Sequence, residues 1–132
     1  MKGIGLLFFA SGVVYVVVGM ALGIWMGAAQ DFTLAPAHAH LNLLGFVTMC
    51  LMGIFYQLTP KAAERLLSRV HFGLATLGLW LMVPGIAIAV NGGGEAFAIA
   101  GSLVTAAAMV TFLVNLVQTA MRPSSRGAAL PA

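Results

Sequence analysis

The chain has 132 residues, of which 61% are hydrophobic and 7% are charged, and its mean hydropathy is +1.05. This composition lies far outside that of soluble globular proteins and indicates an integral membrane protein surrounded by membrane lipid. The formal charge of +3 comes from basic residues that flank the apolar segments. It therefore reflects membrane topology and gives no reason to expect a nucleic-acid partner.

Four apolar segments reach the roughly 20 residues that a helix needs to span a bilayer. They cover about residues 3–27, 36–58, 70–90 and 96–120. The connections between them are too short to hold a soluble domain. We therefore predict an all-α fold, in which residues 1–132 form a single transmembrane domain built as a four-transmembrane-helix bundle.

The basic residues all fall on one side of the membrane in this arrangement, at Lys2, Lys61, Arg65, Arg69, Arg122 and Arg126. The connections on the other side carry Asp31 and Glu95. The positive-inside rule then predicts a bacterial inner-membrane protein with both termini in the cytoplasm. The first apolar segment is longer than the roughly 7 to 15 residues of a cleavable signal peptide, so we expect it to be retained.

The first segment carries glycines at four-residue spacing, at Gly19, Gly23 and Gly27. Such a ridge of small residues allows two helices to approach closely. Two interpretations are open at this point, packing within one subunit and contact between subunits.

Two histidines, His38 and His40, lie at the start of the second segment. Ligating side chains at membrane depth are rare and usually functional. Each residue of an α-helix turns by about 100°, so these two rings point to nearly opposite faces and cannot bind one metal ion together. Each is then available to a separate site. The alternative is that both rings simply reach headgroup water at the helix end.

The two faces continue along the second segment. The His38 face runs through Asn42, Gly45, Met49, Met52 and Tyr56, and the His40 face through Leu43 or Leu44, Val47, Leu51 and Ile54. Gly45 leaves room for a flat ligand such as a porphyrin below His38, or for a neighbouring helix. We predict His38 and His40 as metal ligands, with Asn42, Gly45 and Met49 beside the cofactor, and we assign no catalytic residue.

His71 opens the third segment and is separated from His40 by about 20 Å or more of membrane depth. It is expected to lie at the membrane interface or to pack between helices or, alternatively, to serve a proton path or a second site. The fourth segment contains polar side chains that are expected to link helices by hydrogen bonds. These are Ser102, Thr105, Thr111, Asn115 and Gln118.

The stretches HAHLNLLGFVTMCLMGIFYQLTP and HFGLATLGLWLMVPGI resemble the tenth and eleventh helices of haem–copper oxidase catalytic subunits, above all those of cbb-type oxidases and nitric-oxide reductases. The resemblance covers less than half of the chain. It implies haem b as cofactor, with His38 as ligand of a high-spin haem and His40 as ligand of a low-spin haem. The corresponding glycine, tyrosine and proline further along are Gly53, Tyr56 and Pro60.

The chain also departs from this family. It has four spans where the family has about twelve, and the copper-ligating histidines of other helices have no counterpart, so an enzyme is not favoured. Arginines that usually hold haem propionates are absent from the outer side. That leaves Gln30, Asn91 and the N–H groups of the glycine loop after Asn91 as propionate partners.

The favoured function is a b-type haem protein for electron transport or for binding a diatomic gas. One alternative is a non-haem copper or zinc protein, because imidazole suits both ions. Another is an accessory or assembly subunit of a respiratory oxidase.

A bis-histidine site needs a second copy of the chain, because His38 and His40 face opposite ways and no other histidine shares their depth. When one face of a helix meets the other face of its copy, the contact must close into a ring. The resemblance implies three four-helix arcs with pseudo-threefold symmetry, so we predict a homotrimer with three haems. A two-fold dimer that pairs two copies of His38 is the alternative.

Overall fold

The structure, a computed structural model, describes residues 1–121. Its elements in chain order are α1 (Gly3–Ala29), α2 (Ala35–His40), the π-helix η1 (Leu41–Thr48), α3 (Met49–Leu58), α4 (Pro60–Ala63), α5 (Leu66–Val90) and α6 (Ala96–Ala120). Arg122 and Arg126, which entered the topology prediction, lie outside the described residues.

Four helices are long and apolar enough to cross a membrane, which confirms the prediction of an all-helical, multi-pass protein. They cover Gly3–Ala29, Ala35–Leu58, Leu66–Val90 and Ala96–Ala120. The second of these is the continuous run of α2, η1 and α3, which we call the second span. The third begins at Leu66, four residues before the predicted start, because the connector becomes helical again after Arg65. Helices suit this setting because they satisfy their backbone hydrogen bonds internally.

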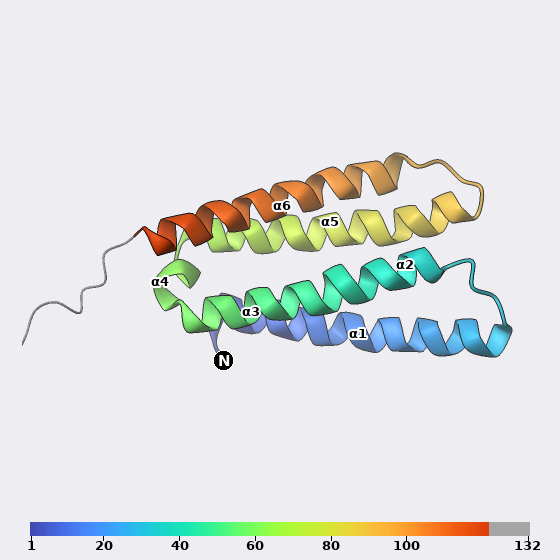
Figure 1. Ribbon diagram of the computed structural model, residues 1–132, viewed down its shortest axis with the longest axis horizontal. Coiled ribbons are helices and arrows are strands. Elements are labelled where there is room, and N and C mark those ends of the chain that lie inside the picture. Colours follow the sequence, from blue (N-terminus) through green and yellow to red (C-terminus); the bar gives the residue numbers. More distant parts are fainter. Residues whose placement is uncertain (122–132) are drawn as a thin grey trace, which may run out of the picture.

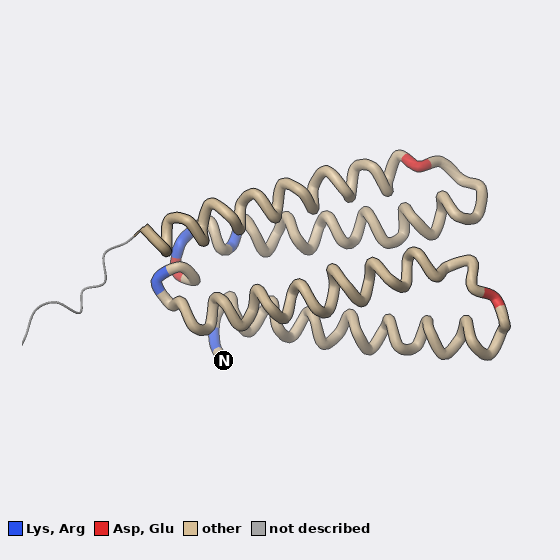
Figure 2. The backbone as a smooth tube through the Cα atoms, in the orientation of Figure 1, with Lys and Arg blue, Asp and Glu red and all other residues tan. Residues whose placement is uncertain are grey.

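The helices form two antiparallel hairpins, one of α1 with the second span and one of α5 with α6 (Figure 1). The short helix α4 joins the hairpins at the end where the chain begins. The described basic residues gather at this end, and Asp31 and Glu95 mark the two loops at the other end (Figure 2). We call these the basic end and the acidic end.

The charge separation gives a first test. The positive-inside rule predicts that the basic end faces the cytoplasm. Reporter fusions placed after Gly27 and after Arg126 should then report opposite sides of the membrane. Equal signals from the two fusions would contradict the proposed topology.

Glycines set the spacing within the first hairpin. A Cβ atom added at Gly5 would lie 3.0 Å from the carbonyl oxygen of Gly53, and one added at Gly12 would lie 2.7 Å from Sγ of Cys50. The backbones of α1 and the second span therefore approach as closely as small residues allow. Phe8, Met49, Met52 and Tyr56 form the buried core at the basic end of this interface.

Candidate functional site

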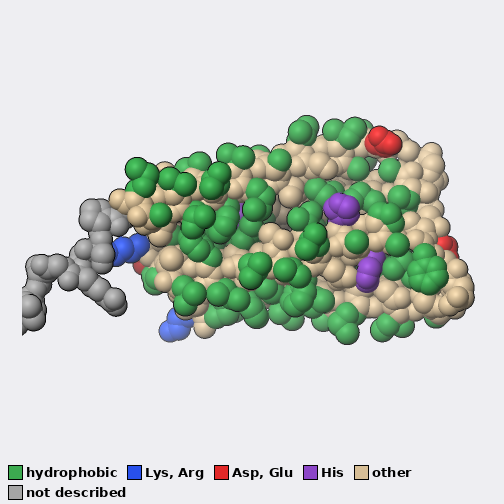
Figure 3. Space-filling view, viewed as in Figure 1, with side chains coloured by type: hydrophobic (Ala, Val, Ile, Leu, Met, Phe, Trp, Pro, Cys, Tyr) green, Lys and Arg blue, Asp and Glu red, His purple; other side chains and the backbone are tan. Residues whose placement is uncertain are grey.

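The two histidines lie on α2, near the acidic end. Pro36 suits the first turn of this helix because proline has no N–H to leave unpaired there. His38 is half-buried and faces α1, whereas the ring of His40 is exposed. Figure 3 shows histidine side chains reaching the surface toward the acidic end. The two rings therefore face different surroundings, with His38 against α1 and His40 exposed.

His40 has the orientation of a ligating imidazole. Its Nδ1 lies 2.8 Å from the backbone oxygen of Pro36. A carbonyl oxygen can only accept a hydrogen bond, so Nδ1 is the donor, and in a neutral imidazole Nε2 then has the free lone pair. A backbone partner of this kind commonly fixes the tautomer of metal-bound histidines. The exposed His40 ring is thus accessible to a ligand from outside this chain.

His38 is held against α1 by Asn42 and two glycines. Nδ2 of Asn42 lies 3.0 Å from Nε2 of His38, and a Cβ atom added at Gly23 would lie 3.0 Å from Cε1 of His38. A Cβ atom at Gly19 would collide with Oδ1 of Asn42. These two glycines of the predicted ridge therefore receive the His38–Asn42 pair within one chain. A Cβ at Gly27 would have no neighbour within 4 Å.

A π-helix follows directly after His40, and sequence reasoning missed it. Over Leu41–Thr48 the backbone adopts the wider i→i+5 turn, and the hydroxyl of Thr48 donates to the carbonyl oxygen of Leu43, five residues earlier, at 2.9 Å. Such segments often mark functional sites. The apolar residues here carry no signal that distinguishes a π-turn from an α-turn, because both bury the same kinds of side chain.

Gly45 and Met49 lie inside the chain below His38. A Cβ atom at Gly45 would lie 3.0 Å from Cβ of Tyr15 and 3.1 Å from Cδ2 of Leu79. The space over Gly45 is thus filled by neighbouring helices, as in the packing alternative raised for this glycine. Met49 is 2% exposed and belongs to the core. The structure brings His38 and Asn42 together and turns His40 away from them.

The expected propionate partners bind their own helix ends. Nε2 of Gln30 donates to the carbonyl oxygen of Gly27 at 2.6 Å, and Nδ2 of Asn91 donates to that of Ala87 at 2.8 Å. The N–H groups of Gly92 and Gly93 donate to Ala89 and Ile88. These hydrogen bonds therefore help to close the C-terminal ends of α1 and α5.

The loop at the acidic end also keeps a negative charge. The hydroxyl and the N–H of Thr33 bind the carboxylate of Asp31 and lower the pKa of this exposed side chain. Asp31 therefore stays ionised at neutral pH, and its negative charge would repel a haem propionate.

A second polar cluster, absent from our sequence-based site, lies near the basic end. His71 is fully buried, and its Nδ1 lies 2.9 Å from the hydroxyl of Tyr56. Nδ2 of Asn115 donates to the same hydroxyl at 3.3 Å, and Nη1 of Arg65 donates to Oδ1 of Asn115 at 2.7 Å. We call these four residues the Asn115 network. His71 thus packs between helices, and Phe8 and Phe112 lie against its ring.

Polar residues in an apolar span were the available signal for this network, since both His71 and Asn115 stood out in the sequence. Their mutual position was not predictable, because it depends on how the two hairpins pack. Within residues 1–121, no group of three or more His, Cys, Asp or Glu side chains is placed to hold a metal ion.

Comparison with known protein families, with curated proteins and with solved structures finds no match. The likeness to haem–copper oxidases therefore rests on the residues quoted for it.

Proposed function

We propose that this chain is a b-type haem-binding membrane protein in which a haem lies between two copies, bound by His40 of one copy and His38 of the next. The observation that carries the proposal is the His40 imidazole, which is exposed and uses Nδ1 for its contact with the backbone oxygen of Pro36, so that Nε2 is left for a ligand. A neutral imidazole with a free nitrogen is the usual axial ligand of haem iron in b-type proteins.

The two histidines fit this role unequally. His40 is ready to bind as it stands. His38 must first turn away from Gly23 and give up its contact with Asn42, which also holds a buried Oδ1 without a hydrogen-bond partner in residues 1–121. We propose that Asn42 stabilises the free form of His38 and releases it when a second copy presents its haem-binding face.

The outer face of the second span supports an intermolecular site. Leu43, Val47, Leu51 and Ile54 are all exposed along the His40 face. This face is apolar and follows the ligating residue down the helix, so it suits a flat hydrophobic macrocycle or the helix of a neighbour. Because the pairing joins unlike faces, it is heterologous, and closure after three copies gives the proposed homotrimer in the inner membrane.

When bound, the haem would supply one-electron transfer or a binding place for a diatomic gas. The residues of the chain position the imidazoles and exclude water around them. Electron transfer is the function we favour, because two histidines, His38 and His40, would hold the haem.

The ligand assignment is tested by absorption spectra of detergent-purified variants. We expect the unmodified protein to show paired α and β bands on reduction. His40→Ala and His38→Ala should each lose most of the haem or leave five-coordinate iron, because alanine has no side-chain atom that can bind iron. His71→Ala removes a histidine outside the site and should keep its haem per folded protein.

Loss of haem in His71→Ala alone would refute the assignment. A colourless protein that carries copper would favour the non-haem alternative. Assembly is tested separately by native mass spectrometry, which should find three chains with up to three haems. Mixing His38→Ala with His40→Ala subunits should restore a fraction of the sites, because a mixed interface is intact when the His38→Ala subunit supplies His40 and the His40→Ala subunit supplies His38. A dimer with a single haem would overturn the ring.

A further inference from the structure

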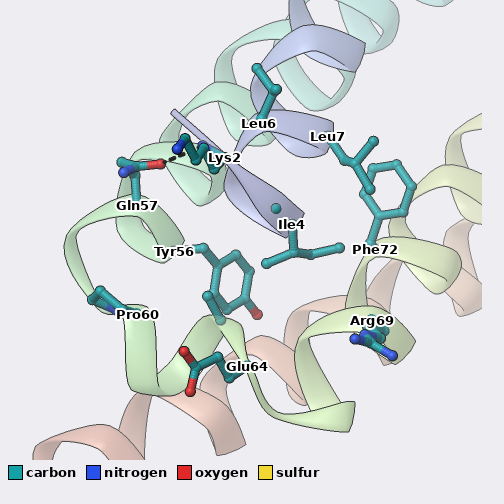
Figure 4. Close-up of a pocket in the computed structure, with 12 residues that line it drawn as sticks. Lys2, Ile4, Leu6, Leu7, Tyr56, Gln57, Pro60, Glu64, Arg69 and Phe72 are labelled. Atoms are coloured by element: carbon teal, nitrogen blue, oxygen red, sulfur yellow. Dashed lines mark hydrogen bonds between the residues drawn. The ribbon is translucent and has the colours of Figure 1, made fainter.

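A groove of about 870 Å³ opens between the two hairpins at the basic end, far along the chain from the histidine site. Its wall comes from the start of α1, the end of α3, the short helix α4 and the start of α5 (Figure 4). The residues that line this groove include Lys2, Ile4, Leu7, Glu64, Arg69 and Phe72.

The polar part of the groove favours an anion. Lys2 and Arg69 lie on opposite sides of it, with Ile4 and Tyr56 between them (Figure 4). Glu64 is the one acidic lining residue among those described, so the lining side chains sum to a charge of +1 from two cations and one anion.

The N-terminus of α1 adds to the positive electrostatic potential of the groove. Gly3 and Ile4, its first residues, line the groove, and neither a capping side chain nor an acidic residue occupies the first turn. The N–H group of Lys2 is already bound to Oε1 of Gln57 at 3.2 Å. The next N–H groups of the helix have no intrahelical acceptor, and such groups bind phosphate well.

The remainder of the groove is apolar and leads along the membrane-spanning part of the chain. Leu6 and Leu7 are 44% and 52% exposed, and Phe72 is half-buried beside them. A ligand that combines an anionic head with an apolar tail matches this division. The groove lies among basic residues at the expected membrane surface. A lipid with an anionic head group is therefore available from the surrounding leaflet.

We propose that this groove binds one anionic phospholipid, with its phosphate at the N-terminus of α1 facing Lys2 and Arg69 and an acyl chain along Leu7 and Phe72. The lipid contacts both hairpins and bridges them where α4 joins them. The proposal is independent of haem binding.

The test uses the full chain in nanodiscs that contain equal amounts of phosphatidylglycerol and phosphatidylcholine, followed by native mass spectrometry of the lipid retained. One phosphatidylglycerol per chain should be retained in preference to phosphatidylcholine. The double variant Lys2→Gln/Arg69→Gln should lower this retention by about tenfold, because each cation near a membrane surface contributes to binding an anionic lipid.

Three further variants distinguish a built site from general surface charge. Lys61→Gln removes an exposed cation outside the groove and should leave retention unchanged. Lys2→Arg/Arg69→Lys keeps both charges and should also retain the lipid. Glu64→Gln removes the opposing charge and should strengthen retention. Equal retention of the two lipids, equal loss in Lys61→Gln, or displacement of the lipid by millimolar inorganic phosphate would overturn the proposal.

Discussion

Replacing Gly101 by leucine should separate α6 from α5 and destabilise the protein by about 3 kcal/mol, a large value for overpacking. A Cβ atom at Gly101 would collide with the backbone nitrogen of Met82 on α5. Backbone atoms cannot turn aside as a flexible side chain can, so the helices themselves must move apart. On α5, Gly78 lies equally close to Thr105 of α6, and Gly85 to Ala98 of α6. If the two helices moved apart, both of these contacts would be lost as well.

The measurement is the detergent-unfolding midpoint of the purified variant, followed by circular dichroism. Leucine is a strong helix former, so any loss reports packing rather than helix propensity. Gly73→Ala is the control, because this glycine lies inside α5, the helix that packs against α6, and a Cβ there meets nothing within 4 Å. The control should be at least as stable as the unmodified chain. Equal midpoints for Gly101→Leu and Gly73→Ala would show that α5 and α6 do not pack as described.

The variant Asn115→Ala should lose about 1 to 3 kcal/mol, because it leaves buried donors and acceptors without partners. The Asn115 side chain joins the Tyr56 hydroxyl to Nη1 of Arg65, and its Nδ2 also lies 3.4 Å from the carbonyl oxygen of Ala62. Asn115 is fully buried. Its removal therefore weakens the link between the two hairpins at the basic end.

Ser102→Ala is the control for Asn115→Ala. Ser102 lies on the same helix and is exposed, and its hydroxyl donates only to the carbonyl oxygen of Ala98 at 2.8 Å. We expect this change to alter stability by less than about 0.5 kcal/mol. If thermal unfolding in detergent shifted equally in both variants, the Asn115 network would have no special role in joining the hairpins.

The number of spans was predictable because length and hydropathy alone decide whether a helix can cross a bilayer. The opposed orientation of His38 and His40 was also predictable, since it follows from the geometry of one helical turn. Which of the two rings faces the interior was not. Both faces of the second span are apolar, so the usual contrast between a core face and a solvent face is missing.

The contacts around His38 also could not be predicted from the sequence. Gly19 and Gly23 were recognised as a ridge, but their partners Asn42 and His38 depend on the register between two helices. That register is fixed by backbone shape, which includes the π-helix that begins at Leu41. The haem and the trimer remain predictions, because both depend on contacts between copies of the chain.

The division into two hairpins has a consequence for biosynthesis. The contacts described for His38 and His40 all come from residues 19–42, within the first hairpin. A nascent chain can therefore form these contacts before α5 and α6 leave the ribosome. The second hairpin then adds Leu79 over Gly45 and Asn115 beside Tyr56. We therefore expect the positioning of His38 and His40 to precede the final closure of the bundle during membrane insertion.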